Sequence, residues 1–317
     1  MNREFKIRDE IILPGETKHL DFFISRLPTG TVINMPVIVG RSKRQGPTLL
    51  LSAGMHGDEI NGVEIVRRIV KERLFVPKRG SVICIPIVNT LGFINFSREN
   101  SGGKDVNRSF PGTQTGSLAS QIAYFLSSEI LPLIDCGIDF HTGGNRINNF
   151  PQIRTVFNHA PSLELARVFS APYTLNAPLR DKSLRKHALS FEKPILVYEA
   201  GESMRLRKHS VDVGVNGALR VMKHLGMRDE APTPRIPSTS LKKSVWVRAK
   251  RSGMHHSVVR YGSEVSVNDV IGHITDPYGK SQIVVKSPSN GHIIAINNLP
   301  IINRGDALFH LGFENDD

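Results

Sequence analysis

Through the first two thirds of the chain, short apolar runs alternate with segments of helical periodicity. Short, mostly apolar runs bounded by polar or turn residues indicate strands, and they occupy residues 32–39, 48–53, 81–88, 136–140 and 194–198. Between them, apolar residues recur every three or four positions, which predicts helices over 61–74, 117–134 and 212–225. This alternation predicts an α/β fold with a mostly parallel mixed sheet flanked by helices.

The last third of the chain has a different pattern. Residues 229–240 contain three prolines and resemble a linker. After them, short apolar segments separated by glycine turns replace the helical period. We therefore predict two domains: a catalytic α/β domain over residues 1–230, and a small all-β, barrel-like domain over residues 241–317.

Composition places the chain among ordinary globular proteins, with 317 residues, 39% hydrophobic and 22% charged. No apolar run approaches the roughly 20 residues of a membrane span, and the N-terminus lacks the apolar core of a signal peptide. Cys84 and Cys136 lie in apolar runs, so we expect buried free thiols. These features predict a cytoplasmic protein with no membrane partner.

The formal net charge is +12, with denser basic clusters at residues 180–187 and 205–209. Neither cluster is interleaved with aromatic residues, and no zinc-finger or RNA-binding signature is present, so we predict no nucleic-acid partner. Two interpretations remain: a solvated surface, or a rim that attracts an acidic substrate.

Candidate metal ligands follow two of the predicted strands. His56 and Glu59 lie just after the run 48–53, within a glycine-containing turn, and His141 ends a later apolar run. Two histidines and one carboxylate form the ligand set of hydrolytic zinc sites, which leave a fourth position for water. Asp139 lies two positions before His141 and would point to the same side of a strand, where a carboxylate could orient the imidazole.

Two further segments carry candidate chemistry. Arg98 and the polar stretch 105–112 have no helical or strand period, which is typical of a functional loop or of an incidental surface loop. Glu199 follows the apolar run 194–198 and could act as a general base on water. Glu202 is its rival, and we interpret it as a helix-start or rim residue.

Four motifs occur in a fixed order: His-Gly-Asp-Glu, Asp-x-Asn-Arg-x-Phe-Pro-Gly, Asp-x-His-Thr-Gly and Glu-x-Gly. Together they resemble the succinylglutamate desuccinylase/aspartoacylase family, which is related to the zinc carboxypeptidases. The resemblance covers roughly residues 30–312. It implies a zinc carboxypeptidase-like fold and an amidohydrolase that cleaves the linear amide bond of an N-acyl amino acid.

The resemblance also assigns roles to individual residues. It implies one Zn²⁺ per chain, bound by His56, Glu59 and His141, with Glu199 as general base and proton shuttle. Arg98 would polarise the scissile carbonyl and stabilise the oxyanion.

Substrate binding and support of the metal involve four further residues. The resemblance implies that Asn107 and Arg108 bind the substrate α-carboxylate. Asp105 would be the outer partner of a zinc-bound histidine, and Asp139 competes with it for that role.

The acyl group is left open, because no clear counterpart exists for every residue that would hold an acyl carboxylate. Arg180, Arg185 and Arg205 are candidates. The alternative function is a metallocarboxypeptidase that trims a C-terminal residue, with acidic, glutamate-rich peptides as its substrates. The oligomeric state is also open, with a homo-oligomer among the alternatives.

Overall fold

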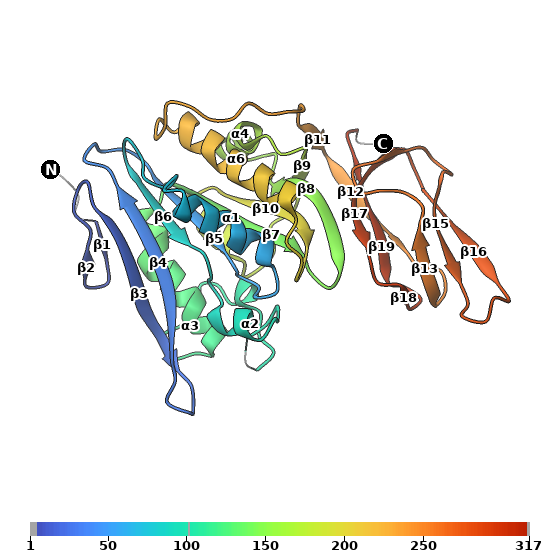
Figure 1. Cartoon of the computed structure of the whole chain (residues 1–317), viewed down its shortest axis with the longest axis horizontal. Coiled ribbons are helices and arrows are strands. Elements are labelled where there is room, and N and C mark those ends of the chain that lie inside the picture. The colour runs from blue at the N-terminus through green and yellow to red at the C-terminus, as the bar shows by residue number, and fades with distance from the viewer. Residues whose placement is uncertain (1–4, 101, 316–317) are drawn as a thin grey trace.

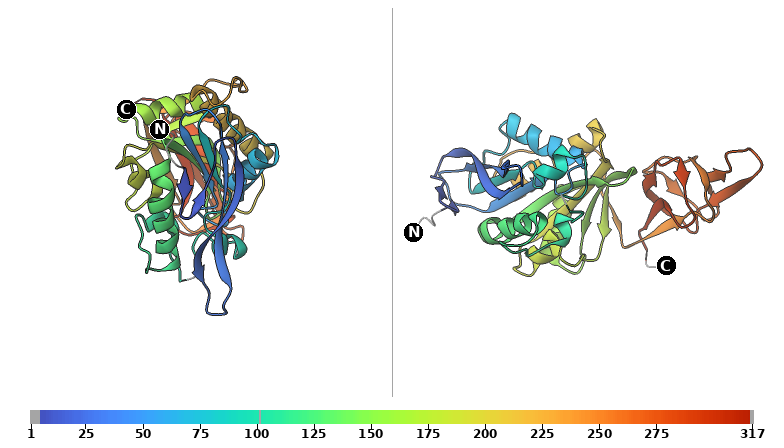
Figure 2. Two further views of the ribbon diagram at one scale, coloured as in Figure 1. Left: turned by 90° about the vertical axis from the view of Figure 1, so that its left-hand side faces the viewer. Right: turned by 90° about the horizontal axis from the view of Figure 1, so that it is seen from below.

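The computed structural model describes residues 5–100 and 102–315. Figure 1 shows a helix-covered sheet that continues into antiparallel strands from the C-terminal part of the chain. Figure 2 shows the same C-terminal strands projecting as a separate lobe when the molecule is turned. Within the described residues, no helix has the length and hydrophobicity needed to cross a membrane.

The large sheet contains 13 strands. They are β3 (Thr17–Arg26), β4 (Val32–Arg41), β5 (Thr48–Ala53), β6 (Ser81–Ile85), β7 (Cys136–Gly143), β8 (Ile147–Thr155), β9 (Tyr173–Asn176), β10 (Ile195–Glu202), β11 (Thr239–Leu241), β12 (Lys243–Arg248), β14 (Glu264–Val265), β17 (Gly291–Asn297) and β19 (Ala307–Phe313). Strands β6, β5, β7 and β10 pair in parallel at the centre, and antiparallel strands extend the sheet on both sides. The predicted α/β fold with a mixed sheet is confirmed, and four neighbouring parallel strands form its centre.

Helices cover both faces of the central strands (Figure 1). The α-helices of the described chain are α1 (Ile60–Lys71), α2 (Thr90–Ile94), α3 (Leu118–Phe125), α4 (Ala160–Phe169), α5 (Leu184–Leu189) and α6 (Lys208–His224). Leu49 and Leu51 pack with α1, α4 and α6, whereas Leu50 packs with α3 and α5 on the opposite face. Because successive strand residues face opposite sides, the centre of β5 is apolar at every position from Leu49 to Leu51.

The predicted helix over 117–134 forms only in part. Ser117 caps α3 by accepting a hydrogen bond from the backbone N–H of Ser120, as a helix-start serine should. After Phe125 the chain continues as one π turn, η2 (Leu126–Ile130), and one 3₁₀ turn, η3 (Leu131–Leu133). Pro132 lies in that last turn, where it cannot donate the hydrogen bond of a continuing α-helix.

The C-terminal domain consists of two antiparallel sheets around one core. Its second sheet contains β13 (Gly253–Ser257), β15 (Val270–Thr275), β16 (Gln282–Lys286) and β18 (Ile301–Ile302). Ile271 and Ile274 of this sheet pack in one cluster with Phe309 and Leu311 of β19. The large sheet continues into this domain through the antiparallel pair β17–β8, so C-terminal residues lie beside strands of the N-terminal part of the chain.

The remaining elements complete the chain. β1 (Lys6–Ile7) and β2 (Glu10–Ile11) form a small hairpin. Part of the predicted linker is ordered as β11, which pairs in parallel with β9. Cys84 and Cys136 are free and buried, as predicted.

Candidate active site

The sequence-predicted site residues gather at the carboxyl ends of the parallel strands β5, β7 and β10. Glu199 of β10 is the register partner of His141 of β7, and Asp139 is the register partner of Ser52 of β5. Ligands of open α/β sheets bind beyond the carboxyl ends of the strands. Parallel pairing therefore brings residues that lie far apart in sequence to one edge of the sheet.

A tight turn after β5 positions the first two ligand candidates. Gly54 has φ +62°, a conformation that favours glycine. A Cβ atom on Gly57 would lie 1.9 Å from the carbonyl carbon of Gly92 in α2. The two glycines thus let the turn pass against α2 while His56 and Glu59 enter the buried interior.

His56, Glu59 and His141 form one buried cluster whose ligand atoms all lie within 4.8 Å of one another. Glu59 Oε1 is 2.8 Å from His56 Nδ1, and Glu59 Oε2 is 2.8 Å from His141 Nδ1. The backbone N–H of Thr142 also donates to Glu59 Oε2 at 3.1 Å. Both imidazoles therefore direct Nδ1 toward the same carboxylate, as ligands converging on a single ion would.

The outer nitrogen of each imidazole contacts a second carboxylate. His56 Nε2 is 3.2 Å from Asp105 Oδ1, and His141 Nε2 is 2.7 Å from Asp139 Oδ2. Ser52 donates to the other oxygen of Asp139 at 2.8 Å. Such carboxylates hold the proton on Nε2 and leave Nδ1 free to bind a metal. The residues present thus fit a divalent metal. Asp105 and Asp139 do not compete for one role, because each contacts a different histidine.

The charges of the cluster shift its pKa values strongly. Burial disfavours the charged imidazole of His141, but the neighbouring charges of Asp139 and Glu59 outweigh burial and raise its pKa well above the ordinary value. The pKa of His56 is also raised, because Glu59 and Asp105 outweigh its burial. Burial opposes ionisation of Glu59, yet the two histidines hold its pKa well below the ordinary value. The cluster therefore attracts positive charge, which a metal ion would supply.

Arg98 lies against the open side of the cluster. Its Nη1 is 3.2 Å from His56 Nδ1 and 3.4 Å from Glu59 Oε1, and its Nη2 donates to Asp105 Oδ2 at 2.9 Å. Its side chain is 40% exposed, so the guanidinium reaches both the buried cluster and the solvent-filled space above it.

The polar stretch 105–112 contains a turn that its sequence pattern does not predict. Asp105 accepts a hydrogen bond from the backbone N–H of Asn107 at 2.7 Å and caps the 3₁₀ turn η1 (Val106–Arg108). Asn107 Oδ1 accepts from the backbone N–H of Leu184 at 2.9 Å, which leaves its Nδ2 as the donor available to a ligand. Arg108 is exposed and lines the cavity that also contains His56, Glu59 and His141.

Both oxygens of Glu199 are held by residues of the neighbouring strand β8. Asn149 Nδ2 donates to Oε2 at 2.9 Å, and Arg154 Nη1 lies 3.2 Å from Oε1. Sequence reasoning missed both residues, which lie on the same strand. The interpretation of Glu202 as a rim or helix-start residue is wrong: Glu202 is buried at the end of β10 and accepts a hydrogen bond from Asn298 at 2.8 Å.

These groups line a cavity of about 650 Å³. The C-terminal domain contributes Trp246 and His310 to its wall, stacked with ring centroids 4.3 Å apart. Arg180 and Arg185 of the first basic cluster also line it, whereas the cluster 205–209 is absent from the described lining. Among the described residues, the first basic cluster therefore contributes arginines to the cavity and the second does not.

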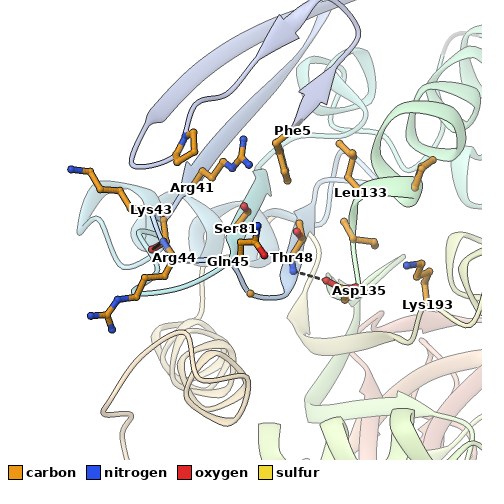
Figure 3. Close-up of a pocket in the computed structure, with 16 residues that line it drawn as sticks. Phe5, Arg41, Lys43, Arg44, Gln45, Thr48, Ser81, Leu133, Asp135 and Lys193 are labelled. Carbon is orange, nitrogen blue, oxygen red and sulfur yellow. Dashed lines mark hydrogen bonds between the residues drawn. The ribbon is translucent and has the colours of Figure 1, made fainter. Parts of the chain in front are cut away.

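A second cavity, of about 330 Å³, lies at the opposite ends of the same strands. Figure 3 shows Arg41, Lys43 and Lys193 around it, with the carboxylate of Asp135 bound to the backbone N–H of Thr48. That hydrogen bond is 2.7 Å long and ties the start of β5 to the residue before β7. The metal-ligating cluster lies in the larger cavity, which is the candidate active site.

The fold and the cluster define an α/β protein with a His–Glu–His cluster that could hold a metal ion at the carboxyl edge of its sheet. The model of the succinylglutamate desuccinylase/aspartoacylase catalytic domain matches residues 45–225, more than half of the chain. The chain belongs to this family, whose members act on N-acyl amino acids.

The chain is also similar to individual proteins and solved structures. The N-alpha-acetyl-L-2,4-diaminobutyric acid deacetylase of Halomonas elongata is 27% identical over 291 residues, which cover 87% of this chain and 84% of that protein. A crystal structure of succinylglutamate desuccinylase/aspartoacylase from Rhodobacter sphaeroides has a TM-score of 0.84 at 24% identity, covering 95% and 96% of the two chains. The product-bound ectoine utilization protein of Ruegeria pomeroyi has a TM-score of 0.86 at 20% identity, covering 99% and 100%. These two structures share the fold.

Proposed function

We propose that this protein is a zinc-dependent hydrolase that cleaves the amide bond of an N-acyl amino acid. The observation that carries the proposal is the buried cluster of His56, Glu59 and His141, with Glu199 on the adjacent strand in the same cavity. Membership of a family that acts on N-acyl amino acids, and the deacetylase activity named for the Halomonas relative, support the reaction class.

The roles of the residues follow from their positions. Zinc, when bound by the three ligands, supplies a Lewis acid and makes water more acidic. Glu199, held through both oxygens by Asn149 and Arg154, is placed to accept the proton of the attacking water and return it to the leaving amine.

Charge that develops on the amide oxygen needs a donor, and the partly exposed guanidinium of Arg98 beside the cluster provides one. We assign the substrate α-carboxylate to Arg108 and to the free Nδ2 of Asn107, since both residues line the cavity. The products are a carboxylic acid and a free amino acid.

A substrate panel tests this proposal. The purified protein, loaded with Zn²⁺, is incubated with N-acetyl, N-succinyl and N-glutamyl amino acids and with short acidic peptides, and amine release is measured. Release from an N-acyl amino acid that a chelator abolishes supports the proposal. Release from peptides alone would replace it with the carboxypeptidase alternative.

A further inference from the structure

The second cavity, at the amino ends of the central strands, is separate from the active site (Figure 3). Thr48 and Ser81, the first residues of β5 and β6, line it, and so does Lys193, two residues before β10. β5 contains six residues and therefore extends over about 20 Å. A small ligand held in this cavity cannot touch the metal-ligating cluster at the other end of the strands.

Positive charge dominates the described lining of this cavity. Its basic side chains are those of Arg41, Lys43, Arg44 and Lys193. Among the residues that the structure describes, the only carboxylate of the lining is that of Asp135, which accepts a hydrogen bond from the backbone N–H of Thr48. Within residues 5–100 and 102–315, the charged groups of Lys43, Arg44 and Lys193 form no ion pair and no hydrogen bond. The cavity therefore has an excess of positive charge that favours an anionic ligand.

Two buried hydroxyl groups add neutral donors at the strand ends. The side chains of Ser81 and Thr48 line the cavity, although these residues are only 4% and 7% exposed (Figure 3). Neither hydroxyl group has a hydrogen-bond partner among the described residues. Because buried polar groups are normally hydrogen-bonded, these two hydroxyl groups are placed to donate to the oxygens of a ligand.

The loop that carries Lys43 and Arg44 is fixed by backbone contacts. The N–H of Ser42 donates to the backbone oxygen of Gly80 at 2.9 Å, and the N–H of Gly80 donates to that of Arg44 at 2.9 Å. The aliphatic stem of Lys43 packs against Gly15, where a Cβ atom would lie 3.0 Å from its Cγ and Cε atoms. An ordered backbone presents these basic groups, which reduces the entropic cost of binding a ligand.

The kinds of donor around the cavity favour a phosphate group. Ammonium, guanidinium and hydroxyl groups come from separate segments of the chain (Figure 3). A carboxylate is bound best by the parallel N–H groups of one arginine, whereas phosphate accepts hydrogen bonds on several sides and is a common ligand of lysine. Phe5 and Leu133 add an apolar wall, and a volume of about 330 Å³ suits a small organic molecule.

We propose that this cavity is a second ligand site, which binds a small organic phosphate. Lys43, Arg44 and Lys193 are the charged partners of the phosphate group, and the hydroxyl groups of Ser81 and Thr48 are its neutral donors. The apolar wall contacts the carbon part of the ligand. This inference does not depend on the proposed function, because the site lies outside the catalytic cavity.

Calorimetric titration of the zinc-loaded protein with glycerol phosphate tests the site, and parallel titrations use succinate and glycerol. The parent protein should bind glycerol phosphate more tightly than succinate and should not bind glycerol. Lys193→Met should weaken binding of glycerol phosphate on the order of 10- to 100-fold, the worth of a hydrogen bond to a charged group. Ser81→Ala removes no charge and should weaken it roughly 3- to 10-fold.

Two control variants remove a positive charge elsewhere. Lys223→Met changes an exposed lysine of α6 outside both described cavity linings, and Arg180→Met changes an arginine of the active-site cavity. Both should bind glycerol phosphate as the parent does. Lys193→Met and Ser81→Ala should keep the parent's stability in urea unfolding, since neither change removes a side-chain hydrogen bond or ion pair of the described chain.

Several results would contradict the site. Failure of the parent to bind glycerol phosphate, or equal affinity in the parent and in Lys193→Met, would overturn it. An equal loss in Lys223→Met would mean that net charge alone attracts the anion. A loss in Arg180→Met without a loss in Lys193→Met would place the anion in the active site. Succinate bound as tightly as glycerol phosphate would overturn the choice of phosphate. None of these outcomes involves amine release, so failure of the proposed function would leave them unchanged.

Discussion

Replacing Glu199 by Gln separates proton transfer from the rest of the site. The carboxylate of Glu199 accepts from Asn149 Nδ2 at 2.9 Å and pairs with Arg154 Nη1 at 3.2 Å. A Gln side chain has the same shape, but its amide nitrogen cannot accept a hydrogen bond, so one of the two contacts is lost. None of the three metal ligands is altered.

The expected magnitude follows from these contacts. General acid–base catalysis contributes roughly 10²- to 10⁴-fold to rate, so Glu199→Gln should raise the barrier by about 3–5 kcal/mol. The loss of one of the two contacts of residue 199 should lower the free energy of unfolding by about 1 kcal/mol. Zinc content should be unchanged, and KM should change far less than kcat.

The assay compares this variant with Glu202→Gln, which makes the same change three residues along the same strand. Glu202 is buried, whereas Glu199 is partly exposed, and Glu202 contacts Asn298. Steady-state rates, metal content and urea unfolding are measured for both variants. Glu202→Gln should lose stability and keep its rate per folded molecule. A Glu199→Gln protein as fast as the parent would show that another group moves the proton.

Three further perturbations address separate parts of the account. Asp139→Asn should lower zinc affinity roughly 10- to 100-fold, because it weakens the carboxylate that orients His141; chelator competition measures this, and an unchanged affinity would contradict it. His310→Phe should make the stability of the folded protein less sensitive to acid. The depressed pKa of His310 contributes stability above pH 6.5 that is lost as pH falls toward about 3. Between pH 7 and 5 the free energy of unfolding, measured with urea, should therefore fall by about 2 kcal/mol more in the parent than in the variant. Equal losses would mean that His310 charges freely in the folded protein. Gly57→Ala should cost more than about 4 kcal/mol, because its Cβ would overlap the backbone of Gly92; a variant with the parent's Tm would show that the turn can move away from α2.

The sequence predicted the central strands well because both of their faces are buried. Leu49, Leu50 and Leu51 point alternately into two hydrophobic clusters, so the centre of β5 is an apolar run that pattern reasoning detects. The site residues at the ends of these strands were visible for the same reason. Their order along the chain and the parallel pairing together explain how His56, Glu59 and His141 meet.

The missed residues lie on a strand whose sequence lacks the hydrophobic pattern of a buried strand. Strand β8 contains buried Asn149 and Gln152 as well as Arg154. Asn149 and Arg154 line the cavity, and Gln152 donates to the backbone oxygen of Ile294. Polar residues at buried positions conceal a strand from hydrophobic periodicity. The stacking of Trp246 on His310 joins distant parts of the chain and is set by tertiary structure. The contact of His56 with Asp105 also joins distant parts, and only the family resemblance led us to expect it. The domain boundary between residues 230 and 241 stays a prediction.

Metal content measured together with chelator-sensitive amine release tests the central claim most directly. We predict about one zinc per chain in the purified protein, amine release from an N-acyl amino acid, loss of release on chelation and recovery when zinc is restored. His141→Ala should bind no zinc at this site and release no amine. A folded protein that holds no metal, or one that releases amine equally well after complete chelation, would contradict the account.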